Sequence, residues 1–170
     1  LYKKINKEKN IVVSFIGEGT LGEGASYEAF NLSSLHQTPQ LFVCENNFYS
    51  QSTPQNHSVP GNITDRPKSF GIKVFEANTW EVEKLNKVAF EAIQYVRKGK
   101  PAFLNISTYR LNAHSKGDDD RDPKEIDYFF SKDPLSAILS NPKWSKEADV
   151  IKETIDNHIK SVKVDVIDES

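Results

Sequence analysis

Four short apolar runs recur along the chain and predict four β-strands. They carry few polar residues and show no strict alternation, which is typical of parallel strands that are buried on both faces. The predicted strands are Ile11–Ile16, Leu41–Glu45, Lys73–Glu76 and Ala102–Thr108. Parallel strands need long connections between them, so we expect helices in the intervals.

Apolar residues at helical spacing occupy two of these intervals and the end of the chain. The first helix is predicted at Ala25–Leu35 and the second at Val82–Val96, with Gly99 marking its end. A third helix is predicted at Ala148–Val162, where the apolar residues share one face. Strands that alternate with helices predict an α/β fold with a doubly wound, mainly parallel sheet and helices on both of its faces.

Two segments lack periodicity and are expected to be irregular. The first, Gln51–Phe70, is rich in proline. The second, Leu111–Pro123, is polar and lacks apolar anchors, so we expect it to be mobile until a ligand orders it. Its run Asp118–Asp120 lacks the residue spacing of an EF-hand and is interpreted as a solvated acidic loop.

Size and charge suit one globular domain without a polyanionic partner. We predict a single α/β domain over residues 1–170, in which residues 141–170 are a C-terminal helical extension. The formal net charge of −2 and the lack of a long basic run argue against nucleic acid or a membrane surface as a partner. The longest apolar run is far too short to cross a bilayer.

The first residue and the single cysteine each support one further expectation. The sequence begins with Leu1 and contains no methionine, so it is interpreted as a fragment or a processed product. Cys44 lies within a predicted strand and is interpreted as a small buried hydrophobe rather than a catalytic thiol. A single cysteine cannot form an internal disulfide, which fits a reducing cytoplasm.

Two polar motifs follow the first two predicted strands. Gly17-Glu18-Gly19 comes after the first strand, and Asn46-Asn47 comes after the second. Loops at the carboxyl ends of parallel strands meet at one edge of a sheet, which would bring a carboxylate and an amide together. These hard oxygen ligands suit Mg²⁺ or Ca²⁺. Glycines let the backbone approach a ligand, and the following helix can offer amides to a phosphate. The motifs therefore predict a cradle for a diphosphate and magnesium.

The sequence around these motifs carries a family resemblance. The segment FIGEGTLGEGASYEAFNLSSLHQTPQLFVCENNFYSQSTP resembles the cofactor-binding segment of the alpha subunits of thiamine-diphosphate-dependent 2-oxo acid dehydrogenases. The segments GKPAFLNISTYRLNAHSKGDDDR and KEIDYFFSKDPL resemble the family's Thr-Tyr-Arg strand, its His-Ser loop and the stretch after that loop. The family includes pyruvate, branched-chain 2-oxo acid and acetoin dehydrogenases. The resemblance covers residues 11–140 and implies the thiamine-diphosphate-binding fold, truncated at its N-terminus.

The resemblance implies roles for individual residues. It implies that Glu18, Asn47 and the backbone carbonyl of Tyr49 bind Mg²⁺. The amides of Gly19 and Thr20 are implied to face the diphosphate. Glu18 stands where nearly all relatives carry aspartate. Because Mg²⁺ demands short bonds, the extra methylene implies either that the loop lies farther from the metal or that the metal binds more weakly.

The resemblance also implies a role in catalysis for His114. Its imidazole would contact the diphosphate and the reacting centre, because it can donate to phosphate oxygens and move protons near neutral pH. The neighbouring Ser115 aligns with a serine that is phosphorylated in mitochondrial relatives, and local hydrogen bonding is its expected role in this chain.

The implied activity is oxidative decarboxylation of a small-molecule 2-oxo acid, followed by acyl transfer to the lipoyl group of a partner acyltransferase. Thiamine diphosphate and Mg²⁺ are the implied cofactors, and a beta subunit in an α2β2 heterotetramer is the implied partner. The residues quoted above supply half of the cofactor site, so we expect the 170-residue chain to be inactive by itself.

Two alternatives stay open. The first is a transketolase-like or synthase enzyme that uses the same cofactor, although the Asn46-Asn47 and His114-Ser115 motifs favour the dehydrogenase. The second is a degenerate, non-catalytic subunit, which Glu18 in place of aspartate suggests. Magnesium-dependent binding of thiamine diphosphate separates an enzyme from a scaffold.

Overall fold

Four strands form one parallel sheet, close to the positions that the apolar runs predict. A computed structural model describes residues 1–117 and 119–168, with side chains as far as Val162. Asp118, part of the predicted acidic loop, lies outside the described residues. The strands of the sheet are β1 (Val12–Gly17), β2 (Gln40–Asn46), β5 (Lys73–Asn78) and β6 (Ala102–Ser107).

The order of the strands is β1-β2-β6-β5, and every neighbouring pair is parallel. The chain winds from β1 to β2, passes to the far edge for β5 and then returns to insert β6 beside β2. The direction of winding therefore reverses between β2 and β6. In open α/β sheets the carboxyl ends of the strands at such a reversal form the usual ligand-binding crevice.

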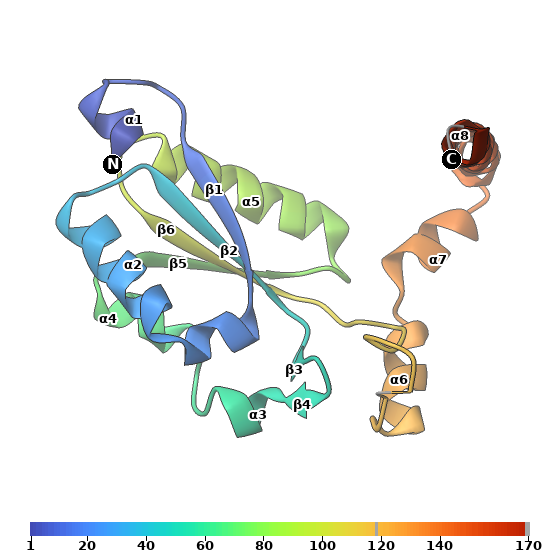
Figure 1. The fold of residues 1–170 in the computed structure, drawn as a ribbon, viewed down its shortest axis with the longest axis horizontal. Helices are drawn as coiled ribbons and strands as arrows, with labels where there is room; N and C mark the ends of the chain where they lie inside the picture. Colours follow the sequence, from blue (N-terminus) through green and yellow to red (C-terminus); the bar gives the residue numbers. More distant parts are fainter. Residues whose placement is uncertain (118, 169–170) are drawn as a thin grey trace. The chain divides into compact units, whose positions relative to one another are not determined.

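Helices cover both faces of this sheet, with α2 (Gly24–Leu35) on one face and α5 (Val82–Val96) on the other (Figure 1). On one face, Phe30 of α2 lies edge-on to Phe42 and Phe103, with ring centroids 5.0 Å and 5.9 Å away. On the other face, Ala92 and Val96 of α5 pack in the cluster that contains the inward side chains of β2 and β6. The predicted fold class, a doubly wound and mainly parallel α/β sheet, is confirmed.

Short elements join the strands where the sequence shows little periodicity. The segment 51–70, expected to be irregular, instead contains part of a two-stranded hairpin and two short helices, and Val59 and Ile63 within it are buried. The apolar contacts of these two residues hold short elements in place, although the sequence shows no periodic pattern that predicts them. The short elements before residue 131 are α1 (Tyr2–Ile5), η1 (Glu18–Gly22), β3 (Tyr49–Ser50), β4 (Thr53–Pro54), α3 (Gln55–Ser58), α4 (Asp65–Ser69) and α6 (Pro123–Phe130).

The contacts divide the chain into a unit of residues Leu1–Phe130 and a second unit that begins at Ser131. The second unit contains α7 (Pro134–Leu139) and α8 (Ser145–Asp168), which extends the predicted third helix at both ends. Asp133 caps α7, because its carboxylate accepts hydrogen bonds from two amides of the first turn at 3.2 Å and 3.0 Å. None of the helices built by the described residues is long and apolar enough to cross a membrane.

Candidate functional site

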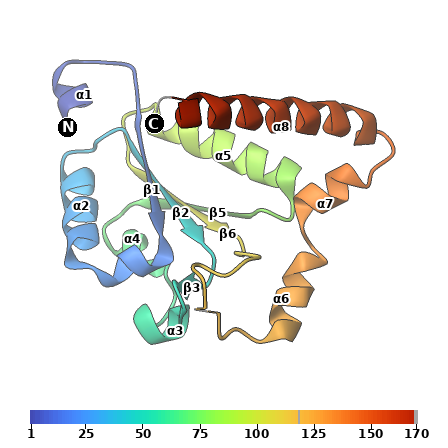
Figure 2. The same cartoon turned by 45° about the vertical axis from the view of Figure 1, so that its right-hand side comes forward.

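Three adjacent strands end at the same edge of the sheet. β1 ends at Gly17, β2 at Asn46 and β6 at Ser107, and the three strands are neighbours in the sheet. The amide of Thr108 donates a 2.9 Å hydrogen bond to the carbonyl of Asn46, which keeps the first residue after β6 beside the end of β2. In Figure 2 the arrowheads of β1 and β2 point toward the hairpin and α3. The loops that carry the predicted site residues therefore leave from neighbouring positions.

Glu18 and Asn47 are in direct contact. The backbone amide of Asn47 donates a 3.3 Å hydrogen bond to Oε2 of Glu18. The Glu18 side chain is 2% exposed, so it is not the surface glutamate that a turn after a strand usually carries. The described hydrogen bonds give this buried carboxylate one long N–H donor. A buried carboxylate is costly unless a cation or several donors compensate it, so the position fits a bound cation.

A tight turn after β2 presents the other predicted ligands. Oδ1 of Asn47 accepts a 3.0 Å hydrogen bond from the amide of Tyr49, while Phe48 between them has a positive φ of 69°. An amide oxygen has two lone pairs, so Asn47 keeps acceptor capacity beyond this turn. Tyr49 pairs with Pro54 in the hairpin, and proline has no N–H to donate to the Tyr49 carbonyl. Both oxygens therefore suit a hard cation beside Glu18.

The glycine after Glu18 permits a close approach of two loops. A Cβ atom on Gly19 would lie 2.1 Å from Oγ of Ser50 in β3, so a larger residue at this point would force the Ser50 side chain to move. Gly19 and Thr20 stand at the start of η1, and the first amides of such a turn have no acceptor within it. The turn is held from behind by Ser26, whose hydroxyl donates a 2.7 Å hydrogen bond to the Thr20 carbonyl.

Cys44 lies buried beneath this edge. Its thiol is fully buried, and burial raises its pKa to about 12, with further contributions from the carboxylates of Glu18 and Glu45. A thiol with this pKa stays protonated at neutral pH and is a poor nucleophile. Its interpretation as a small buried hydrophobe agrees with this burial.

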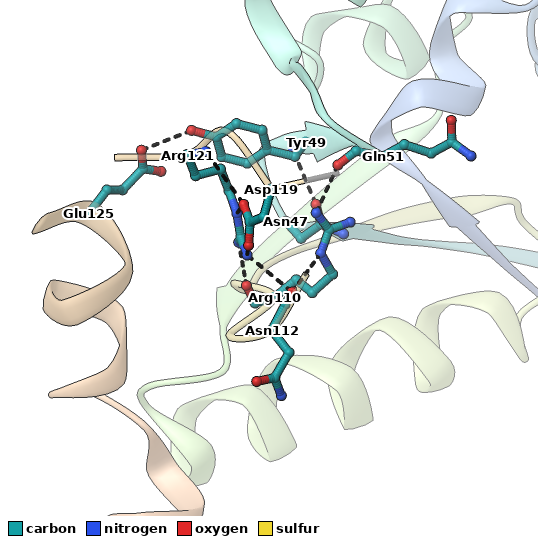
Figure 3. A network of polar contacts seen from close by, with 8 residues as sticks. All are labelled: Asn47, Tyr49, Gln51, Arg110, Asn112, Asp119, Arg121 and Glu125. Atoms are coloured by element: carbon teal, nitrogen blue, oxygen red, sulfur yellow. Dashed lines mark hydrogen bonds and ion pairs between the residues drawn. The ribbon is translucent and has the colours of Figure 1, made fainter. Parts of the chain in front are cut away.

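The loop after β6 carries His114. Arg121 organises this loop through the polar contacts that Figure 3 shows. His114 lies exposed on this loop. The Arg121 side chain is 2% exposed, and its Nε and one terminal nitrogen contact the two carboxylate oxygens of Asp119 at 2.6 Å and 2.7 Å. Arg121 also donates to the carbonyls of Arg110 and Asn112. This polar anchor is what the sequence-based interpretation of an unanchored loop missed.

Aromatic rings tie the same loop to helix α6. The ring of Phe129 stacks on Tyr109 with centroids 3.9 Å apart, and the ring of Trp80 stacks on Phe129 with centroids 5.4 Å apart. The Arg121 guanidinium lies 5.7 Å from the Tyr49 ring centroid and 5.1 Å from that of Tyr109. The loop after β2, the loop after β6 and α6 therefore form one connected network.

The structure thus brings together part of the predicted site. Glu18, Gly19, Asn47 and Tyr49 lie on contacting loops, and Thr20 belongs to the same turn, whereas His114 lies exposed on the neighbouring loop. Within the described part of the chain, no three His, Cys, Asp or Glu side chains gather as a metal-holding group. The predicted ligand set therefore depends on an amide oxygen and a backbone carbonyl beside a single carboxylate.

Sequence reasoning missed two residues of this network, Arg121 and Glu125. Glu125 accepts a 2.8 Å hydrogen bond from the hydroxyl of Tyr49, and burial, followed by this hydrogen bond, raises the pKa of Tyr49 to about 12. The only signal for Arg121 is an arginine two residues after Asp119 in an otherwise acidic stretch. Such a spacing does not reveal that the arginine is buried.

Comparison with known proteins identifies the family. The chain matches the family described as dehydrogenase E1 component over residues 1–169. The pyruvate dehydrogenase E1 component subunit alpha of Rickettsia felis is 35% identical over 156 residues, which cover 87% of this chain and 48% of that protein. The 2-oxoisovalerate dehydrogenase subunit alpha of Bacillus subtilis is 30% identical over 174 residues, which cover 96% of this chain and 52% of that protein. The chain spans about half the length of the curated relatives it matches.

Among solved structures, a transketolase variant from Pichia stipitis has a similar fold. The TM-score is 0.50 at 23% identity, and the match covers 58% of this chain and 15% of that chain. A likeness at this identity concerns the fold alone, and it agrees with the observed parallel sheet. The sequence match over residues 1–169 is what assigns the family: this chain belongs to the dehydrogenase E1 component family.

Proposed function

We propose that this chain is the part of an alpha subunit that binds Mg²⁺ and the diphosphate in a thiamine-diphosphate-dependent 2-oxo acid dehydrogenase. One observation carries the proposal: the buried carboxylate of Glu18 meets the amide of Asn47 at 3.3 Å, at the carboxyl edge of adjacent parallel strands. Family membership supports the choice of cofactor, because the relatives are E1 alpha subunits of pyruvate and 2-oxoisovalerate dehydrogenases.

The protein's part in this function is to hold and orient the cofactor. Glu18, the Asn47 amide oxygen and the Tyr49 carbonyl would ligate Mg²⁺, and the first amides of η1 would face the diphosphate. When bound, thiamine diphosphate supplies the carbanion chemistry of decarboxylation. His114 would donate a charge-assisted hydrogen bond to the diphosphate and move a proton near the reacting centre.

The proposal extends to partner proteins. A beta subunit would complete the cofactor site in an α2β2 heterotetramer, and a lipoyl acyltransferase would receive the acyl group derived from a small 2-oxo acid. The names of the relatives, which call them alpha subunits, support a partner subunit. A cytoplasmic location is proposed as well, since Cys44, the one cysteine, is free and buried.

Metal-dependent cofactor binding tests this function. In the full-length protein, calorimetric titration should show that thiamine diphosphate binds in the presence of Mg²⁺ and not in the presence of chelator. Asn47→Ala should weaken Mg²⁺ binding by at least about tenfold, because it removes a ligand oxygen. Asn56→Ala is the matched control, since Asn56 is an exposed amide in α3. Unchanged affinity in Asn47→Ala contradicts the assigned site, and no binding by the wild-type protein favours a scaffold.

Glu18→Asp tests the departure from the family residue. Aspartate shortens the side chain by one methylene, so metal binding should be equal or tighter if the loop can approach the cation. A large loss of affinity instead means that the loop has adapted to glutamate. The same calorimetric titration measures both outcomes. Neither outcome changes what the Asn47→Ala variant tests.

A further inference from the structure

A second buried oxygen beneath the carboxyl edge lacks a hydrogen-bond donor. Asn105 in β6 is 6% exposed, and its Oδ1 has no hydrogen-bond partner among the described residues. Buried acceptors are nearly always satisfied by protein or by ordered water, so an unpaired amide oxygen calls for a donor that the described residues do not supply.

Asn105 belongs to the face of the sheet that lies under Glu18. In the register of the parallel strands, Cys44 of β2 pairs with Ile16 on one side and with Asn105 on the other. Residues in register on parallel strands point to the same face and lie about 4.8 Å apart. Glu18 follows β1 directly, and its carboxylate is close enough to contribute to the raised pKa of the Cys44 thiol, whose main cause is burial. Ile16, Cys44 and Asn105 therefore form one row across the sheet, and Glu18 begins η1 two residues beyond Ile16.

The Glu18 carboxylate and the Asn105 amide oxygen are two buried acceptors with too few described donors. The Glu18 carboxylate receives one long N–H contact, from Asn47, and the amide oxygen of Asn105 receives none that the structure describes. A cation compensates the carboxylate, but β2 lies between β1, which leads to Glu18, and β6, which carries Asn105, so we expect that one cation does not reach both oxygens with short bonds. A cation that keeps part of its water shell can, because the bound water donates hydrogen bonds, and Mg²⁺ usually keeps several waters in protein sites.

We propose that Asn105 accepts a hydrogen bond from a water molecule on the divalent cation that Glu18 binds, and so positions the metal from below the sheet edge. The proposal rests on the proposed function and adds a positioning residue to it. No ligand motif in the sequence predicts this residue. Groups of this kind do not touch the metal, yet they orient its ligands, and their loss commonly weakens metal binding by 10- to 100-fold.

The decisive variant is Asn105→Leu, which keeps the branched shape of the side chain and removes its acceptor. With thiamine diphosphate saturating, calorimetric titration with Mg²⁺ should show an affinity about tenfold weaker than that of the wild-type protein. The unfolding temperature without metal should be equal or higher, because an unpaired buried acceptor is gone. The increase that Mg²⁺ produces in that temperature should be smaller than in the wild-type protein.

Thr38→Val is the matched control. The Thr38 hydroxyl is also buried without a partner in the described part of the chain, but it lies just before β2, at the opposite end of the strand. This variant should leave Mg²⁺ affinity within about twofold of wild type, since it removes a comparable group far from the row. Equal losses in both variants would mean a general effect on the fold and would overturn the role of Asn105.

Asn105→Asp keeps the test decisive if leucine is not tolerated. A carboxylate is a stronger acceptor for metal-bound water, so Mg²⁺ should bind more tightly while the metal-free protein loses stability through repulsion with Glu18. Unchanged Mg²⁺ affinity in either variant overturns the inference and means that a plain buried water satisfies Asn105. If Glu18→Gln abolishes Mg²⁺ binding while Asn105→Leu does not alter it, only this inference fails. If the wild-type protein does not bind Mg²⁺ and thiamine diphosphate, the proposed function fails with it.

Discussion

The hydroxyl of Tyr49 donates a 2.8 Å hydrogen bond to Oε2 of Glu125, a residue 76 positions later in the chain. This bond joins the turn after β2, which carries the predicted metal ligands, to helix α6. Its acceptor is a carboxylate, and hydrogen bonds to charged groups are stronger than those between neutral ones. The bond therefore sets the position of α6 relative to the candidate site.

Tyr49→Phe should lower the free energy of unfolding by about 1–2 kcal/mol, because it removes this hydrogen bond and keeps the ring. Urea denaturation measures the change, and Tyr2→Phe is the control, since Tyr2 is 70% exposed. Mg²⁺ affinity should stay the same, because the proposed ligand at this position is the backbone carbonyl. Equal stability of the variant and the wild-type protein would show that the bond to Glu125 is not formed in solution.

Arg121→Lys should destabilise the loop after β6. Lysine keeps the charge but cannot reproduce the planar fork that contacts Asp119 and two carbonyls, so we expect a loss of about 2 kcal/mol. Hydrogen exchange of residues 109–117 should accelerate in parallel. Arg97→Lys, at an exposed arginine, should change neither quantity. A variant that exchanges like the wild-type protein would mean that the loop is held by its aromatic contacts alone.

Cofactor should protect the tip of this loop and not its ends. Arg121 and Tyr109 hold the two ends, whereas residues 112–117 are exposed. Ordering each exposed residue costs about 1–2 kcal/mol, which a charge-assisted bond from His114 to a diphosphate helps to offset. Hydrogen exchange on the full-length protein, with and without thiamine diphosphate and Mg²⁺, is the measurement. Equal protection of the tip in both states would remove His114 from the cofactor site.

The contact between Asp119 and Arg121 should make the loop sensitive to acid. The hydrogen bond from Arg121 holds the pKa of Asp119 at about 2, below its unfolded value of about 3.9. A lowered pKa means that the contribution to stability is present above about pH 4 and is lost as the pH falls toward 2. The difference in urea midpoint between wild type and Asp119→Asn should therefore be constant from pH 7 to about pH 5 and shrink below that. A constant difference down to pH 2 would contradict the lowered pKa.

Gly19→Ala should be destabilising because the new Cβ would lie 2.1 Å from Oγ of Ser50. Overpacking of this kind costs about 1–3 kcal/mol. Gly24→Ala is the control, since a Cβ there meets no atom within 4 Å. In a Ser50→Gly background the cost of Gly19→Ala should fall by at least half, and denaturant unfolding of the four proteins gives the coupling. Additive losses would mean that the two loops do not touch at this point.

The regular part of the fold could be predicted because its signals are local. The apolar runs at 11–16 and 102–108 fall on β1 and β6, and the periodicity of Val82–Val96 coincides with α5. The order of the strands has no such signal, since the position of β6 between β2 and β5 depends on which apolar faces meet. Gln51–Phe70 shows the same limit: its short elements depend on burial of Val59 and Ile63 against η1 and α2.

The candidate site divides in the same way. Glu18 and Asn47 could be proposed because each follows a strand, and parallel strands place their ends together. Arg121 and Glu125 could not be proposed from the sequence. Their contacts with Asp119 and Tyr49 depend on the path of an irregular loop, which has no sequence pattern. The donor shortage at Asn105 is visible only once the register of β2 and β6 is known.

The late insertion of β6 has a consequence for synthesis of the chain on the ribosome. Among the described strands, β5 pairs only with β6. It therefore has no partner strand until residue 107 has emerged, and the edge of β2 that β6 will cover stays open for as long. Unpaired apolar edges are the sites where nascent chains associate wrongly or recruit chaperones. We therefore expect translation products that stop before Ala102 to aggregate, whereas products that extend past Arg121 have both the closing strand and the loop that locks it.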